Sequence, residues 1–216
     1  MKQMLFILCL VVASSILVVA QSSDYKKTEV FAGYSNNQVD TGVDSGNSIQ
    51  SFFRDRDNFN GFEGSAVYNV HRYFGVKGDV SGTYKRQNTT APITVGNTTG
   101  TVSFDTNRSL YNFLGGVQIK DNSSDAKVKP FAHALVGAGH ARFNVKNAVC
   151  TGGITVCPSF VASDSETAFA GAFGGGLDIK VSDKVDIRAI QVDYNPMWFN
   201  GGTANNLRIG VGVVFK

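Results

Sequence analysis

The sequence predicts an all-β protein, an eight-stranded antiparallel up-and-down β-barrel that spans a membrane. The first observation is the last stretch of the chain, residues 206–215, in which apolar residues recur at every second position. A period of two indicates a β-strand with one apolar face. The second observation is a regular alternation of long and short connections along the chain. After the N-terminus no stretch approaches the roughly 20 apolar residues of a membrane helix, and barrel strands escape such a search.

Eight segments are expected to form strands: residues 29–35, 61–69, 74–84, 108–120, 128–142, 166–180, 185–194 and 206–215. The odd-numbered connections (36–60, 85–107, 143–165 and 195–205) are long and polar, and the even-numbered ones (70–73, 121–127 and 181–184) are short. Outer-membrane barrels place short turns in the periplasm and long loops outside the cell. An even number of strands then puts both ends of the barrel domain on the periplasmic side.

Individual strands differ in how clearly they separate two faces. The first strand has Glu29, Gly33 and Ser35 on its polar face, and the second has Glu63, Ser65 and Asn69. The third is the clearest in the middle of the chain, because Lys77, Asp79, Ser81 and Thr83 all face one way. The faces of strand 128–142 stay unassigned, because His133 shares a face with Phe131 and Leu135. The glycine-rich run 171–176 falls within a strand, where it fits tight barrel curvature rather than phosphate binding.

The chain begins with the features of a secretory signal peptide. Lys2 is followed by an apolar run and by the small-residue cleavage site Val18-Val19-Ala20. Residues 1–20 are therefore expected to be removed, leaving residues 21–216 as one barrel domain. The net charge of +3 is small and spread along the chain, so nucleic acid is not an expected partner.

Charged residues on the polar strand faces predict a filled barrel interior. An eight-stranded barrel is about wide enough to be filled by its own side chains, and an unpaired buried charge is very costly. The expected lumen charge network consists of Glu63, Lys77, Asp79, Arg188 and Arg208, and Glu29 is a further candidate. The favoured interpretation is a structural network that plugs the barrel, and the alternative is a gated ion path.

Cys150 and Cys157 are the cysteines that remain after removal of the signal peptide. In an oxidising compartment this spacing predicts a disulfide that pins a surface loop. A metal site is not expected, because no His, Asp or Glu lies between the two cysteines and two thiolates are too few for a closed zinc site.

No enzymatic site is expected. Some outer-membrane barrels are lipid A deacylases with a His-x-Ser pattern, and His140, Ser165 and Glu166 are the nearest candidates for such a site. The sequence has His140-Ala141-Arg142 instead, so these residues are interpreted as surface polar groups. His71 and His133 have no partners nearby in the sequence. No cofactor is expected, since phosphate-loop, zinc and nucleophile-elbow motifs are all missing from the sequence.

The C-terminal residues Arg208, Gly210, Val213 and Phe215 resemble the assembly signal of bacterial outer-membrane barrels, although Lys216 follows the usual terminal aromatic. Two further regions, Phe59 to Gly75 with Asp79 to Tyr84, and Gly174 to Asp178 with Ile187 to Tyr194, resemble hairpins of the OmpA-like barrel family. The resemblance implies a monomeric eight-stranded barrel in the bacterial outer membrane. It also implies contact with membrane lipid and with the barrel-assembly machinery through the C-terminal strand. Because the sequence stops at this signal, the peptidoglycan-binding domain of full OmpA proteins is not expected here.

These observations lead to an integral outer-membrane barrel with a plugged lumen and a structural or surface-interaction role. Its specificity is expected in the long loops around Phe52, Phe53, Met197, Trp198 and Phe199. The alternatives are a small porin-like channel and a soluble, secreted, lipocalin-like barrel for an apolar ligand. A lipocalin requires an apolar interior and usually begins with a Gly-x-Trp motif, which the sequence lacks.

Overall fold

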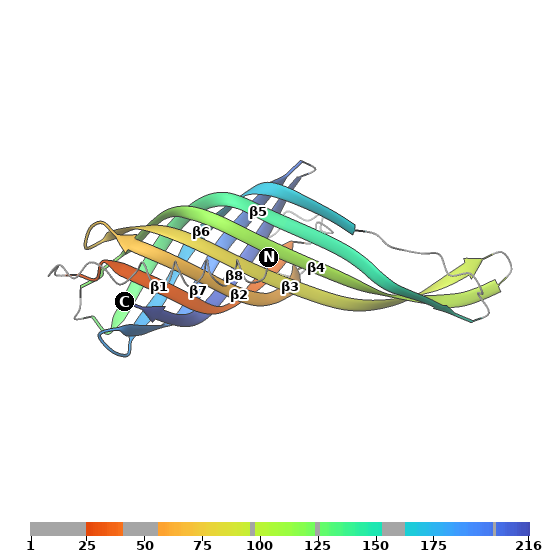
Figure 1. The fold of residues 1–216 in the computed structure, drawn as a ribbon, viewed down its shortest axis with the longest axis horizontal. Helices are drawn as coiled ribbons and strands as arrows, with labels where there is room; N and C mark the ends of the chain where they lie inside the picture. Colours follow the sequence, from red (N-terminus) through yellow and green to blue (C-terminus); the bar gives the residue numbers. More distant parts are fainter. Residues whose placement is uncertain (1–24, 41–55, 96–97, 124–125, 153–162, 201) are drawn as a thin grey trace, which may run out of the picture.

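The computed structural model describes residues 25–40, 56–95, 98–123, 126–152, 163–200 and 202–216. They form eight antiparallel strands that close into a barrel, with β1 paired to both β2 and β8 (Figure 1). The strands are β1 (Thr28–Asp40), β2 (Arg56–Asn69), β3 (Phe74–Val95), β4 (Thr98–Lys120), β5 (Val128–Thr151), β6 (Ser163–Lys180), β7 (Val185–Phe199) and β8 (Gly202–Phe215). The predicted fold class is confirmed. No described helix is long and apolar enough to cross a membrane.

Several strands extend well beyond the bounds expected from the sequence. Most of residues 85–107 belongs to β3 and β4, which pair from Phe74↔Ile119 up to Val95↔Thr98. The expected loop 195–205 is likewise wrong, because β7 continues to Phe199 and pairs there with Gly202 of β8. These segments are polar, which is usual in loops, but strand segments above the membrane need no apolar face. The expected loop residues Phe52 and Phe53 lie outside the described residues.

The extensions of β3, β4 and β5 form an arm that projects from one end of the barrel (Figure 1). β3 pairs with β2 only as far as Tyr84, so its later residues form the edge of the arm. This edge position allows Pro92, which has no N–H to donate to a second neighbouring strand. Hydroxyl pairs cross one face of the arm, with Thr90 Oγ1 2.7 Å from Ser103 Oγ and Thr101 Oγ1 2.7 Å from Thr151 Oγ1.

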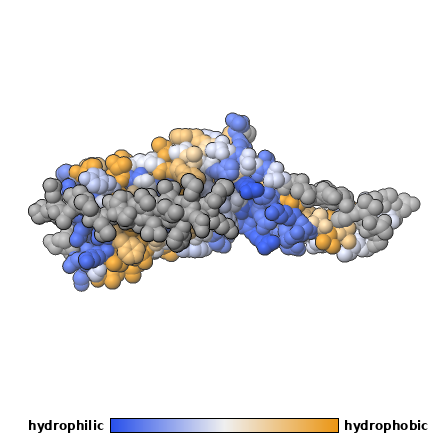
Figure 2. Space-filling view, viewed as in Figure 1, coloured by the Kyte–Doolittle hydropathy of each residue, from blue (hydrophilic) through white to orange (hydrophobic). Residues whose placement is uncertain are grey.

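The barrel has an apolar outside and a polar inside. Figure 2 shows patches of hydrophobic residues on the coloured part of the barrel wall. The exposed large hydrophobic residues include Phe113 (55%), Val76 (56%), Phe169 (56%) and Ile119 (50%). The fully buried side chains include Arg188, Arg208, Lys77, Lys120 and Glu63. This is the reverse of the arrangement in a lipocalin, so that alternative is wrong.

A β-bulge in β7 sets which of its residues face the lumen. The pairing of β7 with β6 shifts between Asp178↔Arg188 and Leu177↔Ile190, leaving Ala189 as the extra residue. Ala189 and Ile190 both face outward, and Arg188 and Gln191 both face inward. Because one extra residue reverses the alternation of a strand, the bulge also turns Asp193 into the lumen.

The glycine-rich part of β6 lies where neighbouring backbones come very close. A Cβ added at Gly174 would overlap Val192 O, one at Gly175 would overlap Phe131 O, and one at Gly176 would overlap Ile190 O. Glycine therefore allows the tight contact between β6 and both of its neighbours that the narrow barrel requires.

Candidate functional site

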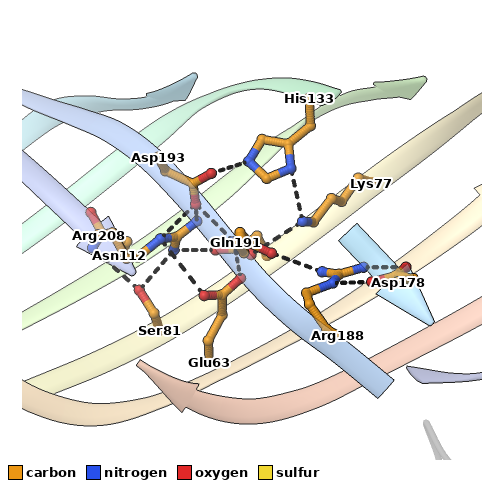
Figure 3. A network of polar contacts seen from close by, with 11 residues as sticks. Glu63, Lys77, Ser81, Asn112, His133, Asp178, Arg188, Gln191, Asp193 and Arg208 are labelled. Atoms are coloured by element: carbon orange, nitrogen blue, oxygen red, sulfur yellow. Dashed lines mark hydrogen bonds and ion pairs between the residues drawn. The ribbon is translucent and has the colours of Figure 1, made fainter. Parts of the chain in front are cut away.

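The lumen contains a network of buried polar side chains drawn from most strands of the barrel (Figure 3). Arg208 of β8 is at its centre. Its Nη1 donates to Asp79 Oδ1 at 2.7 Å and its Nη2 to Asp193 Oδ2 at 2.8 Å. Its Nε lies 3.7 Å from Glu63 Oε2. One guanidinium thus joins carboxylates of β2, β3 and β7 across the inside of the barrel.

Arg188 of β7 forms a second centre nearer the short turns. Its Nε and Nη2 donate to the two carboxylate oxygens of Asp178 at 2.8 and 3.2 Å, and its Nη1 donates to Gln191 Oε1 at 2.8 Å. The guanidinium carbon lies 4.3 Å from the Phe31 ring centre and 4.1 Å from that of Phe131. Two rings and a bidentate carboxylate therefore hold this cation in place.

Gln191 connects the two centres. Its amide nitrogen donates to Glu63 Oε1 at 2.7 Å and to Asp193 Oδ2 at 2.8 Å. Below Arg188, Lys120 bridges Asp178 at 2.8 Å and Glu29 at 2.9 Å. The contacts therefore run without interruption from the middle of the lumen toward its periplasmic end.

His133 and Lys77 form a further branch of the network. The two nitrogens of His133 lie 2.8 Å from Asp193 Oδ1 and 3.2 Å from Lys77 Nζ. Lys77 Nζ also lies 3.8 Å from Asp79 Oδ2. An ammonium can donate to His133 Nδ1 only when that nitrogen carries no proton, so the arrangement fits a neutral imidazole protonated on Nε2.

All five residues of the expected lumen network face the interior, and Glu29 also points inward. Sequence reasoning did not include Lys120, His133, Asp178, Gln191 and Asp193. Lys120 and Asp178 lie near the ends of their strands, where the sequence pattern did not show whether they face the lumen or the lipid. Gln191 and Asp193 fell on the opposite face from Arg188 under simple alternation. The consecutive apolar pair Ala189-Ile190 was the signal for the bulge that reverses them.

An apolar cluster fills the lumen on the extracellular side of the charged network. It consists of Leu110, Leu114, Leu135, Ala170, Ala172 and Met197. Met197 is completely buried here, so its expected role on an exposed loop is wrong. Trp198 points outward with its ring centre 5.4 Å from that of Phe169, and Phe199 packs against the cluster.

A cavity of about 380 Å³ opens above the apolar cluster at the extracellular mouth of the barrel. Phe59, Leu110 and Phe199 contribute apolar walls, and Asp57, Arg108 and Glu166 are among the charged residues around it. Asp57 is paired with Lys85 at 2.5 Å and with Arg108 at 2.9 Å. The side chains at the inner end of the cavity are therefore packed against apolar neighbours or paired with opposite charges.

The histidine, serine and glutamate considered for lipid hydrolysis do not form a triad. His140 Nδ1 lies 2.9 Å from Thr167 Oγ1, and Ser165 is paired instead with Arg142 across the strands. Glu166 accepts a hydrogen bond from the backbone N–H of Asn200 at 3.1 Å and lines the cavity. Among the described residues, no cluster of three or more His, Cys, Asp or Glu side chains could hold a metal ion.

The expected assembly signal lies at the seam where the barrel closes. Phe215 is paired with Val30 of β1 and Val185 of β7, and its side chain is half exposed on the outer wall. Lys216 follows it and turns inward, with Nζ 2.6 Å from Asp186 Oδ1. The extra residue after the aromatic thus adds an ion pair at the periplasmic end of the lumen.

The structure describes one of the two cysteines of the expected disulfide. Cys150 lies in β5 and is disulfide-bonded, whereas Cys157 lies outside the described residues. The pairing of these two cysteines stays a prediction.

A closed barrel with an apolar exterior and a paired, polar interior is an integral membrane β-barrel. The chain belongs to the outer membrane protein beta-barrel domain family, whose model matches residues 6–215. This confirms the family expected from the sequence motifs and places the protein in the bacterial outer membrane.

Two solved structures of one protein support the same fold. Ail, the attachment invasion locus protein of Yersinia pestis, was solved with the heparin analogue sucrose octasulfate. That structure matches with a TM-score of 0.51 at 19% identity, covering 87% of this chain and 97% of Ail. Ail without that ligand gives 0.50 at 18% identity, with the same coverage. Neisserial surface protein A gives 0.47 at 12% identity, covering 90% of this chain and 99% of its own. No curated protein matches the sequence.

Proposed function

We propose that this protein is a closed outer-membrane scaffold that presents its extracellular arm and barrel mouth to partners, and that it is not a pore. The observation that supports the proposal is that the protein's own side chains fill the lumen. Arg208 and Arg188, each at most 1% exposed, hold carboxylates from four strands, and an apolar cluster lies above them. An ion crossing the barrel would have to separate these paired charges and the apolar side chains, and both steps are costly.

Conductance in planar bilayers tests the closed lumen. Wild-type protein should give no steady channels, whereas Arg188→Ala should leak ions because it removes the cation between Phe31 and Phe131. Arg142→Ala, which changes an exposed residue, is the matched control and should remain silent. Steady, large-conductance channels from wild-type protein that Arg188→Ala leaves unchanged would favour the porin-like alternative.

A second candidate function is binding of a sulfated saccharide at the base of the arm. The observation that favours it is a group of cations on three neighbouring strands. It consists of Lys85, Arg86, Arg108, Arg142 and Lys146 on β3, β4 and β5, and the acidic residues near them include Asp57, Asp105, Asp164 and Glu166. Guanidinium and ammonium groups suit sulfate oxygens. The Ail structure with sucrose octasulfate makes this compound a reasonable probe.

Calorimetric titration with sucrose octasulfate tests this candidate. Binding should weaken as salt rises, since exposed charges are screened. The variant Arg86→Gln/Arg142→Gln/Lys146→Gln should lose most of the affinity. Equal binding by wild type and variant, or no binding by wild type at low salt, would exclude it.

A further inference from the structure

The periplasmic end of the barrel carries an arc of lysines at the neighbouring ends of β5, β6, β7, β8 and β1. The backbone N–H of Lys180, at the end of β6, donates to the carbonyl of Lys127, just before β5, at 2.8 Å. That of Lys216 donates to the carbonyl of Lys184, in the β6–β7 turn, at 2.9 Å. Lys26 lies just before β1, whose first residues pair with the end of β8, and Lys26, Lys127 and Lys184 are exposed. The arc is therefore continuous from the start of β5, past β6, β7 and the end of β8, to the start of β1.

Among the described residues, the arc has a surplus of exposed positive charge. Its exposed acidic residue in this part of the chain is Asp183, which is paired with Lys180 at 2.8 Å. The hydrogen bond from Lys180 lowers the pKa of Asp183, and the charges of Lys180, Lys26 and Lys216 lower it further, so these amines lie around one carboxylate. The amine of Lys216 is itself paired with Asp186. Lys26, Lys127 and Lys184 therefore contribute charge that Asp183 does not balance.

An apolar wall lies directly beside this arc. Val128, Ile179 and Ile187 are cross-strand neighbours on β5, β6 and β7, and they are 51%, 42% and 47% exposed. Val181, in the turn itself, is 60% exposed. Acyl chains can pack along this wall while their headgroups reach the lysines at its edge. A soluble anion would use the lysines but not the wall.

We propose that Lys26, Lys127 and Lys184, together with the adjoining apolar wall, bind anionic phospholipid of the inner leaflet of the outer membrane. The ligand class is a phospholipid whose headgroup carries a net negative charge, such as phosphatidylglycerol. Each lysine near an anionic membrane surface contributes about 1 kcal/mol, which is roughly a fivefold change in binding. The site orients the barrel by charge at its periplasmic end, independently of what the extracellular arm binds.

Native mass spectrometry of the folded full-length barrel in detergent tests the proposal. The protein is mixed with equal amounts of short-chain phosphatidylglycerol and phosphatidylcholine, and bound lipid is counted. Wild type should retain phosphatidylglycerol preferentially. The variant Lys26→Gln/Lys127→Gln/Lys184→Gln should reduce that preference by at least about tenfold, since three charges are removed. Heat-modifiable migration on gels verifies that each variant is folded.

The matched control is Arg86→Gln/Arg142→Gln/Lys146→Gln, which removes three cations from the opposite end and should keep the wild-type preference. An equal preference in wild type and the periplasmic variant would overturn the proposal. So would displacement of the lipid by an equal concentration of glycerol phosphate, because the apolar wall would then contribute nothing.

Discussion

Arg188 shows how much one side chain contributes to a narrow lumen. Its guanidinium is 1% exposed in the side chain and bonds Asp178 through two nitrogens. Replacing Arg188 with Ala leaves a buried carboxylate with one fewer cation. We expect a loss of about 3–5 kcal/mol in the free energy of unfolding, the usual cost of breaking a buried pair from one side. Urea titration monitored by the fluorescence of Trp198 measures it.

The control for this prediction is Arg142→Ala, which removes an exposed arginine and should change stability by less than about 0.5 kcal/mol. If Arg188→Ala unfolds at the same urea concentration as the control, the lumen network does not stabilise the barrel.

We expect the stability of one periplasmic turn to depend on pH through Asp121. The N–H of Ser123 donates to its carboxylate at 3.0 Å and Arg72 at 3.2 Å, and these bonds lower the pKa of Asp121 to about 2. A lowered pKa means that the ionised form stabilises the turn at neutral pH. This contribution is complete above the unfolded pKa of about 3.9 and is lost as the pH falls toward 2.

Hydrogen exchange of the Ser123 amide measures the effect. Protection should stay constant from pH 7 to about 4, apart from the intrinsic exchange rate, and should fall below that. Asp121→Asn should lose this step. A step near pH 6 would assign the transition to another group.

At the scale of the element, the bulge in β7 decides which residues meet the lumen. Deleting Ala189 should leave a folded barrel, because Arg188, Gln191 and Asp193 would all still point inward along a regular strand. Deleting Val192 should prevent folding, because Asp193 would then face lipid. Heat-modifiable gel migration distinguishes the two outcomes. Equal folding of both variants would mean that the facing of β7 is not set by the bulge.

The end of the closing strand β8 is expected to control insertion into the outer membrane. Phe215 is half exposed on the outer wall, between β1 and β7. We expect Phe215→Ala to abolish insertion into the outer membrane, since it removes the aromatic of the proposed assembly signal. Fractionation and heat-modifiable migration measure insertion. Lys216→Ala is the control that keeps the aromatic, and it should still insert. Equal membrane-embedded amounts of Phe215→Ala and wild type would contradict the proposed signal.

At the scale of the whole molecule, the barrel and its arm are separable. β3 and β4 remain paired beyond Tyr84, where β3 no longer pairs with β2, so the arm adds no contact that closes the barrel. Replacing residues 87–106 with an Asn-Gly turn should therefore keep the urea midpoint within error of wild type. It should abolish any ligand binding that depends on the arm. A large loss of stability would show that the arm supports the barrel.

The sequence by itself determined the fold class, the number of strands, and the inward facing of Glu63, Lys77, Asp79, Arg188 and Arg208. The physical reason is that lipid outside and a narrow lumen inside impose opposite requirements on alternate residues. The same requirement ends at the membrane surface. For that reason the sequence did not distinguish the extended β3–β4 hairpin from a loop.

Only the tertiary structure decided which charges meet. Arg208 meets Asp193 across the β7–β8 pair. Asp79 and Glu63 lie much earlier in the chain and reach Arg208 only when β8 closes against β1. Asp193 reaches Arg208 because a single extra residue in β7 reverses the alternation on which every facing argument rests. Strand alternation is a local property of the chain, whereas the lumen network depends on register, bulges and closure, and these are set by the whole barrel at once.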